Sequence, residues 1–112
     1  MTNPSKRKGT AFESACRDYL ADVLGRRIER LPAGATLDRG DLTGVDGVAV
    51  ECKAVKQVNL AAIVDEAVAE AANVGPGTLP LAIIKRRQRG VEHAYAVMPL
   101  ESWCDLYLRG GR

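Results

Sequence analysis

The sequence has 112 residues, of which 46% are hydrophobic and 27% are charged, and its formal net charge is +2. A chain of this length and composition supports one hydrophobic core and leaves no room for a separate cofactor-binding domain. No run approaches the roughly 20 apolar residues of a membrane span, and the basic N-terminus lacks the apolar stretch of a signal peptide. Its three cysteines fit neither a disulfide framework nor a zinc site. We therefore expect a cytoplasmic protein with reduced thiols, no organic cofactor and no membrane partner.

Charge is unevenly distributed along the sequence. Residues 1–30 hold seven Lys and Arg against four Asp and Glu, whereas residues 38–66 hold six acids against three bases. An acidic centre between basic stretches is typical of a protein that binds a polyanion and holds a cation on it, although solvated faces give the same pattern. The candidate phosphate contacts are Lys6, Arg7, Lys8, Arg39, Lys85, Arg86, Arg87 and Arg89.

The elements follow in a simple order. The polar residues 1–9 predict a basic flexible arm, and residues 10–112 predict a single domain that begins with a helix over 10–24. Asn59 is the expected N-cap of a second helix. Expected strands cover 27–31, 41–44, 48–55, 79–85 and 93–98, and the two later helices cover 60–73 and 100–108. The order α-β-β-β-α-β-β-α predicts an α/β fold in which helices cover a mixed sheet.

The hairpin over 41–55 contains the residues best suited to chemistry. Glu51 and Lys53 are two residues apart on one strand, so their side chains emerge on the same face. Asp41 joins them if residue 41 pairs with residue 51, which requires an odd number of loop residues. The three-residue loop 45–47, with glycine at its left-handed position, provides that parity.

Two carboxylates converging on an open edge are suited to Mg²⁺, which binds oxygen ligands and retains waters and a phosphate oxygen. A neighbouring ammonium can orient a water and offset the charge that develops on a phosphate. Asp41 and Glu51 are therefore candidate metal ligands, and Lys53 is a candidate catalytic group for phosphodiester hydrolysis. An exposed, ion-paired hairpin face is the structural alternative.

Gly40-Asp41, nine intervening residues and Glu51-Cys52-Lys53 resemble the signature of the PD-(D/E)xK nuclease superfamily. Residues 8–13 and the loop 33–35 are similar to the compact archaeal-type Holliday junction resolvases. The resemblance implies a restriction-endonuclease-like core and a homodimer that cleaves four-way DNA junctions with Mg²⁺, or with Mn²⁺ in its place. It implies catalytic roles for Glu13, Asp41, Glu51 and Lys53, with the metal held by Asp41, Glu51 and the Cys52 carbonyl.

The sequence departs from the family pattern at two positions, and it leaves alternatives open. Gly40 stands where the signature has proline. The exonuclease branch of the superfamily has a glutamine followed by a downstream tyrosine, but here Gln57 is followed by alanine at position 61. Glu13 also fits a capping box that begins at Thr10, and His93 is expected on a strand surface. The competing functions are another nicking or restriction-type nuclease of the superfamily and a catalytically inert DNA-binding module.

Overall fold

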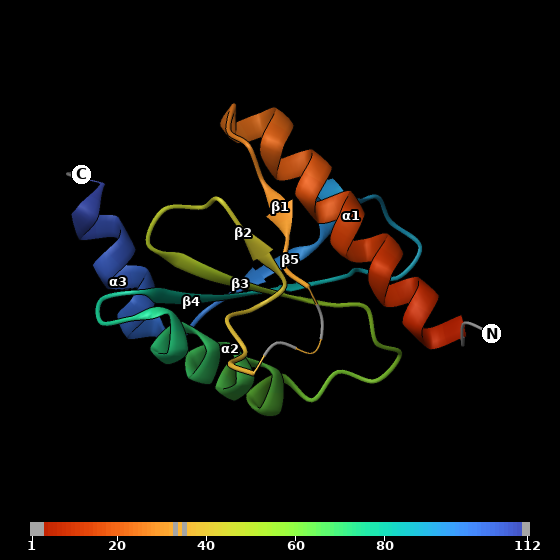
Figure 1. The fold of residues 1–112 in the computed structure, drawn as a ribbon. Helices are drawn as coiled ribbons and strands as arrows, with labels where there is room; N and C mark the ends of the chain where they lie inside the picture. Colours follow the sequence, from red (N-terminus) through yellow and green to blue (C-terminus); the bar gives the residue numbers. More distant parts are fainter. Residues whose placement is uncertain (1–3, 33, 35, 111–112) are drawn as a thin grey trace.

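The computed structural model describes residues 4–32, 34 and 36–110, which form three helices around a five-stranded mixed sheet (Figure 1). In chain order the elements are α1 (Pro4–Leu24), β1 (Glu29–Arg30), β2 (Leu42–Thr43), β3 (Val48–Lys53), α2 (Leu60–Val74), β4 (Leu79–Ile84), a 3-10 helix η1 (Val91–His93), β5 (Tyr95–Val97) and α3 (Leu100–Arg109). The order of helices and strands is the predicted one, and the fold is mixed α/β.

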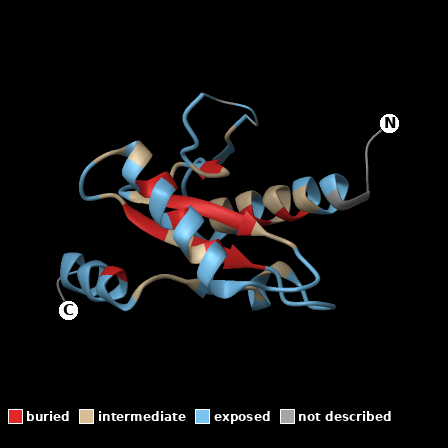
Figure 2. Cartoon of the chain, turned by 90° about the horizontal axis from the view of Figure 1, so that it is seen from below, coloured by how far each residue is buried: buried red, intermediate tan, exposed pale blue. Residues whose placement is uncertain are grey.

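The five strands lie in sequence order across the sheet. β1, β2 and β3 pair antiparallel, β3 and β4 pair in parallel through the crossover helix α2, and β5 returns antiparallel to β4. The two longest strands, β3 and β4, occupy the centre of the sheet and are largely buried (Figure 2). The middle of the sheet is therefore the rigid support for side chains that project from β3.

Helix α1 begins at Pro4, earlier than the predicted start at Thr10. The expected flexible arm over 1–9 is therefore wrong for residues 4–9, which are helical, while residues 1–3 lie outside the described part of the chain. Proline suits the first turn of a helix, because that turn does not need the missing N–H, and the Lys and Arg residues that follow favour helix. The helix thus tolerates a glycine at position 9, which the sequence suggested as the end of an arm.

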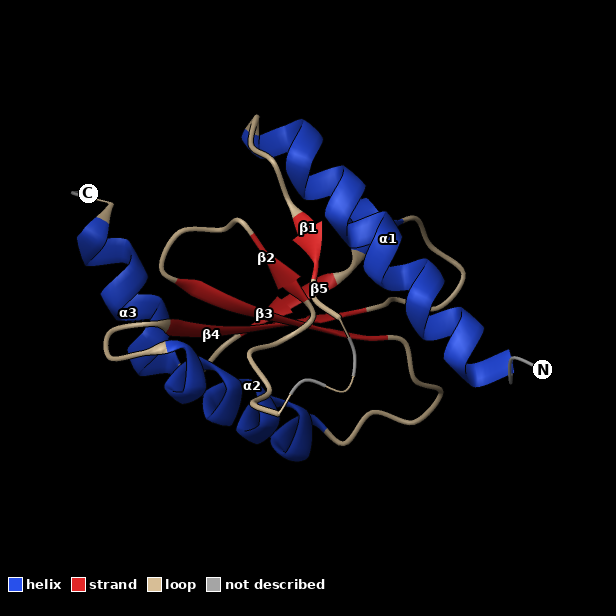
Figure 3. Cartoon of the chain, viewed as in Figure 1, coloured by secondary structure: helices blue, strands red, loops and turns tan. Residues whose placement is uncertain are grey.

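The sheet separates two cores (Figure 3). The core on the α1 face contains Phe12, Cys16, Ile28, Leu42, Val50, Cys52 and Ile83. The core on the α2 face is smaller and contains Ile63, Ala67, Ala82 and Ile84. Because side chains alternate along a strand, Val50 and Cys52 face α1, whereas Glu51 and Lys53 face α2. The prediction that Glu51 and Lys53 share one face of β3 is confirmed.

The C-terminal elements differ in detail from the predictions. His93 lies in the helix η1 rather than on a strand surface, because β5 begins only at Tyr95. In α3 only Ser102 is buried, so the helix leaves Trp103 and Tyr107 half exposed, with their rings stacked at a centroid distance of 5.4 Å. Within the described residues, no helix has both the length and the apolar character needed to cross a membrane.

Candidate metal centre

The β2–β3 hairpin anchors Asp41 against the backbone of β3. Leu42 pairs with Val50, and Asp41 lies just before β2, so the paired residues of β2 and β3 do not include the expected pair of residues 41 and 51. The Asp41 N–H donates to the Val50 carbonyl at 2.7 Å, and Asp41 Oδ2 accepts the Cys52 N–H at 2.7 Å. Because the N–H and C=O of one strand residue point to the same side, the Cys52 carbonyl also lies on the Asp41 side of β3. Its thiol faces the other way, into the α1 core.

Gly40 is required for this close approach of Asp41 to β3. Its φ is +101°, a conformation that L side chains rarely adopt, and a Cβ atom there would lie 2.7 Å from the Val50 carbonyl oxygen. A proline, the residue of the family signature, cannot adopt this φ. The departure from the signature at position 40 therefore has a local structural cause.

On the α2 face, Glu51 meets two carboxylates of α2. One oxygen each of Glu51, Glu66 and Glu70 lies within 4.8 Å of the others. Glu51 and Glu70 are 4% and 2% exposed, so two of the three acids are buried, whereas the Glu66 side chain is 43% exposed. Together with Asp41, whose charge also acts on Glu51, these residues form what we call the acidic cluster.

Lys53 is the cation of the acidic cluster. Its Nζ lies 2.8 Å from Glu66 Oε2 and 3.5 Å from Glu51 Oε2. Burial alone would lower the pKa of the Lys53 ammonium, but the hydrogen bond to Glu66 and the charge of Glu51 outweigh it, and the pKa is raised. Lys53 therefore stays protonated beside the carboxylates, and one positive charge faces several negative ones.

The imbalance of charge changes the proton affinity of the acids. Burial raises the pKa of Glu51 to about 11, and its neighbours Glu66, Asp41 and Glu70 add to the shift. Burial and the adjoining Asp38 raise the pKa of Glu70 to about 8. By contrast, the hydrogen bond with Glu51 and the contact with Lys53 lower the pKa of Glu66. The carboxyl groups of Glu51 and Glu70 therefore hold their protons more tightly than free carboxyl groups do.

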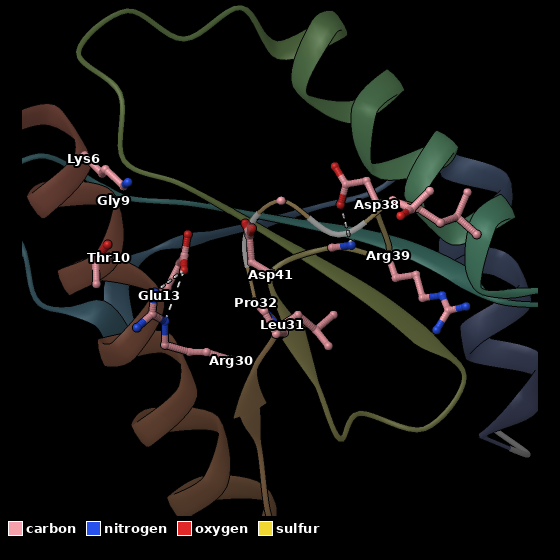
Figure 4. A pocket seen from close by; sticks show the side chains of 14 residues that line it. Lys6, Gly9, Thr10, Glu13, Arg30, Leu31, Pro32, Asp38, Arg39 and Asp41 are labelled. Atoms are coloured by element: carbon pink, nitrogen blue, oxygen red, sulfur yellow. Dashed lines mark hydrogen bonds and ion pairs between the residues drawn. The ribbon is translucent and has the colours of Figure 1, made fainter.

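Glu13 lies on the other side of Asp41, in a cavity of about 850 Å³ between α1 and the segment leading to β2 (Figure 4). Its Oε1 accepts hydrogen bonds from Arg30 Nε at 3.2 Å and from Arg30 Nη2 at 3.1 Å. Glu13 does not close a capping box, because α1 continues through Thr10. Asp41 lines the same cavity, so Glu13 and its partner Arg30 face the space next to the candidate centre.

The predicted phosphate contacts fall into two groups. Lys6, Arg7 and Lys8 lie near the start of α1, and the segment 85–89 leaves β4 beside Lys53, whose carbonyl accepts the Lys85 N–H at 2.9 Å. All these side chains are exposed, and the two segments lie at the same end of the molecule (Figures 1 and 2). Arg39 is separate, because its side chain points away from Lys6 across the cavity (Figure 4).

The sequence interpretation did not include Glu66 and Glu70, although a signal for Glu70 was present. Glu70 follows Ile63 by seven residues and Ala67 by three, so it occupies the buried stripe of α2. A carboxylate among the apolar residues of a helix needs a partner, and the charged groups beside Glu70 are Asp38, Glu51 and Glu66. Asp38, in the segment before β2, accepts the Gly40 N–H at 3.0 Å.

Comparison with known proteins gives no family for this chain: no family model matches it, and neither the curated proteins nor the solved structures provide a match.

Proposed function

We propose that the protein is a Mg²⁺-dependent endodeoxyribonuclease with a restriction-endonuclease-like core, and that it resolves four-way DNA junctions as a homodimer. The observation that supports this most is the hairpin geometry, in which Asp41 is fixed on the Cys52 amide beside Glu51 and Lys53. These are the residues of the PD-(D/E)xK resemblance. A phosphate-binding surface alone does not call for buried acids next to its basic segments.

The donor set fits a hard divalent cation. Asp41, Glu51 and the Cys52 carbonyl, which we call the hairpin site, offer only oxygen atoms, as Mg²⁺ and Mn²⁺ prefer. When bound, the metal would acidify a water and polarise the scissile phosphate. The Lys53 ammonium, held within the acidic cluster, would orient the attacking water and offset negative charge that develops at phosphorus. Arg30, fixed by Glu13, would bind a phosphate oxygen in the adjoining cavity.

The first experiment compares cleavage of a four-way junction, a linear duplex and a single strand, each with Mg²⁺ and with chelator. We expect junction cleavage that requires the metal. Asp41→Asn and Lys53→Ala should abolish turnover and leave DNA binding intact, because these groups act on charge that develops in the transition state. Undiminished cleavage by Lys53→Ala would contradict the assignment. Cleavage of duplex without junction preference would identify a nicking or restriction-type nuclease, and binding without cleavage would identify an inert module.

The basic segments are expected to supply affinity. Replacing Arg86, Arg87 and Arg89 by Gln should reduce the slope of log affinity against log salt by about one for each lost phosphate contact. The same replacement of Arg17, which is paired with Asp18 on α1, is the control and should leave the slope unchanged. A normal slope in the triple variant would remove this segment from the DNA interface.

The proposed homodimer follows from the symmetry of the proposed substrate. A four-way junction is nearly two-fold symmetric and needs matched cuts in two strands, which a two-fold dimer with one site in each subunit would make. The half-exposed rings and leucines of α3 offer an apolar surface for a second copy. Mixed dimers of wild-type and Lys53→Ala subunits should nick one strand and fail to resolve the junction. A monomer in light scattering that binds the junction singly would overturn the paired-site mechanism.

A further inference from the structure

The hairpin site leaves the carboxylates of α2 unexplained. Glu66 and Glu70 are four residues apart on α2, so they are neighbours on the helix surface, where two like charges destabilise the helix. Both point at Glu51, and the three oxygens lie within 4.8 Å of one another. Lys53 compensates Glu66 and Glu51 in this arrangement, but it does not pair with Glu70.

Glu70 is the independent observation that points to a ligand. It is 2% exposed, and neither of its oxygens has a hydrogen-bond partner among the described residues. Lys53 contacts Glu66 and Glu51 but makes no ion pair with Glu70. A buried carboxylate without a donor is strongly unfavourable if it remains charged and unpaired. A cation among the three acids would supply the missing partner.

We propose that Glu51, Glu66 and Glu70 bind a divalent cation of their own, in addition to the cation of the hairpin site. We call these three residues the helix site. The donors are again only oxygens, which selects Mg²⁺ or Mn²⁺ over softer metals. The Glu66 side chain is 43% exposed, so the site is open to solvent from the α2 side. Glu51 belongs to both sites and is the shared ligand.

Two cations that share a carboxylate form an arrangement suited to phosphodiester hydrolysis, since one can stabilise the attacking oxygen and the other the leaving oxygen. This role rests on the proposed function. Cation binding at the helix site does not, because it depends only on the three carboxylates.

The test counts Mn²⁺ bound per chain without DNA, by titration calorimetry with electron paramagnetic resonance detection of free Mn²⁺. We expect two ions for the wild type, one for Glu70→Gln and one for Asp41→Asn. Asp65→Asn, an exposed acid on the same helix, is the matched control and should retain two. Glu66→Gln, which alters the most exposed ligand, serves as a second variant if circular dichroism shows that Glu70→Gln does not fold.

The outcomes separate the helix site from the proposed function. Two ions in both Glu70→Gln and Glu66→Gln, or a single wild-type ion that only Asp41→Asn removes, would overturn the helix site while leaving the nuclease assignment standing. Loss of one ion in Glu70→Gln supports the helix site even if no DNA is cleaved, and in that case the proposed function fails alone.

Discussion

The two faces of β3 show how one short strand combines stability and chemistry. Toward α1 it presents Val50 and Cys52 to a core of apolar side chains, in which the described residues include no buried charge. Toward α2 it presents Glu51 and Lys53 to two further acids. The same backbone therefore supports one face that is stable through burial and another whose charges are balanced only in part. The difference indicates that the α1 face maintains the fold and that the α2 face carries the candidate site.

The largest effect is expected when a charge is placed on the apolar face of β3, where it would remove the difference between the two faces. Val50 is completely buried, so Val50→Asp places a carboxylate where no cation or donor can reach it. The penalty is comparable to the roughly 5–15 kcal/mol that stabilises a typical domain, and we expect the variant to be unfolded. Far-ultraviolet circular dichroism and urea titration measure this. The matched change on the other face, Glu51→Gln, should remain folded; if both variants unfold, the two faces do not differ in this way.

Titration of the charged face sharpens the comparison. The folded-state pKa values of Glu51 and Glu70 are raised from 4.5 to about 11 and about 8, so the folded protein binds more protons than the unfolded chain. This contribution to stability is fully present below about pH 4.5 and is lost as pH rises through about 8 and 11. In chelator, the urea midpoint should therefore fall between mildly acidic and alkaline pH, and Glu51→Gln should flatten that fall. Equal pH dependence in wild type and variant would contradict the shifts.

A smaller effect is expected from Glu13, the acid nearest to the candidate centre on the α1 side. Glu13→Gln weakens the charge pair with Arg30 at a site that is partly exposed, so stability should fall by only about 0.2–1 kcal/mol. The Mn²⁺ count should remain that of the wild type, and cleavage should decrease without being abolished, unlike in Asp41→Asn. Complete loss of cleavage together with loss of an ion would show that Glu13 is a metal ligand.

A further change, which affects stability alone, concerns the helix that carries Glu66 and Glu70. The Asn59 side chain accepts the Ala62 N–H at 3.1 Å and caps α2, as its position in the sequence predicted. Asn59→Ala should cost about 0.5–2 kcal/mol, and Asn59→Ser, which retains a capping oxygen, should restore most of it. Urea unfolding of both variants measures the difference. An equal loss in both variants would mean that the cap oxygen contributes nothing.

Local patterns were sufficient to predict the order of elements, the α2 cap and the two faces of β3, because each depends on residues close in sequence. The start of α1 was predicted wrongly, because a polar segment that ends in Gly9 resembles a flexible arm. Pro4, which suits the first turn of a helix, marks the actual start. In the candidate site, loop parity predicted the register of Leu42 with Val50 but not the position of Asp41, which lies outside β2 and is held by the Val50 carbonyl and the Cys52 N–H. The approach of Glu66 and Glu70 to Glu51 could not be derived in this way. It depends on how α2 is rotated against the sheet, which is set by packing of Ile63 and Ala67.

The crossover from β3 through α2 to β4 has a consequence for folding kinetics. The continuous segment 48–84 carries Glu51, Lys53, Glu66 and Glu70, so the charged face closes within one β-α-β unit. Parallel pairing is slow, because the whole crossover must be ordered before the strands meet, and repulsion among the acids raises that barrier further. A cation that reduces the repulsion among these acids should therefore lower the barrier to pairing β3 with β4 during folding. Stopped-flow refolding should therefore be faster in Mn²⁺ than in chelator, and Glu70→Gln should remove most of the difference.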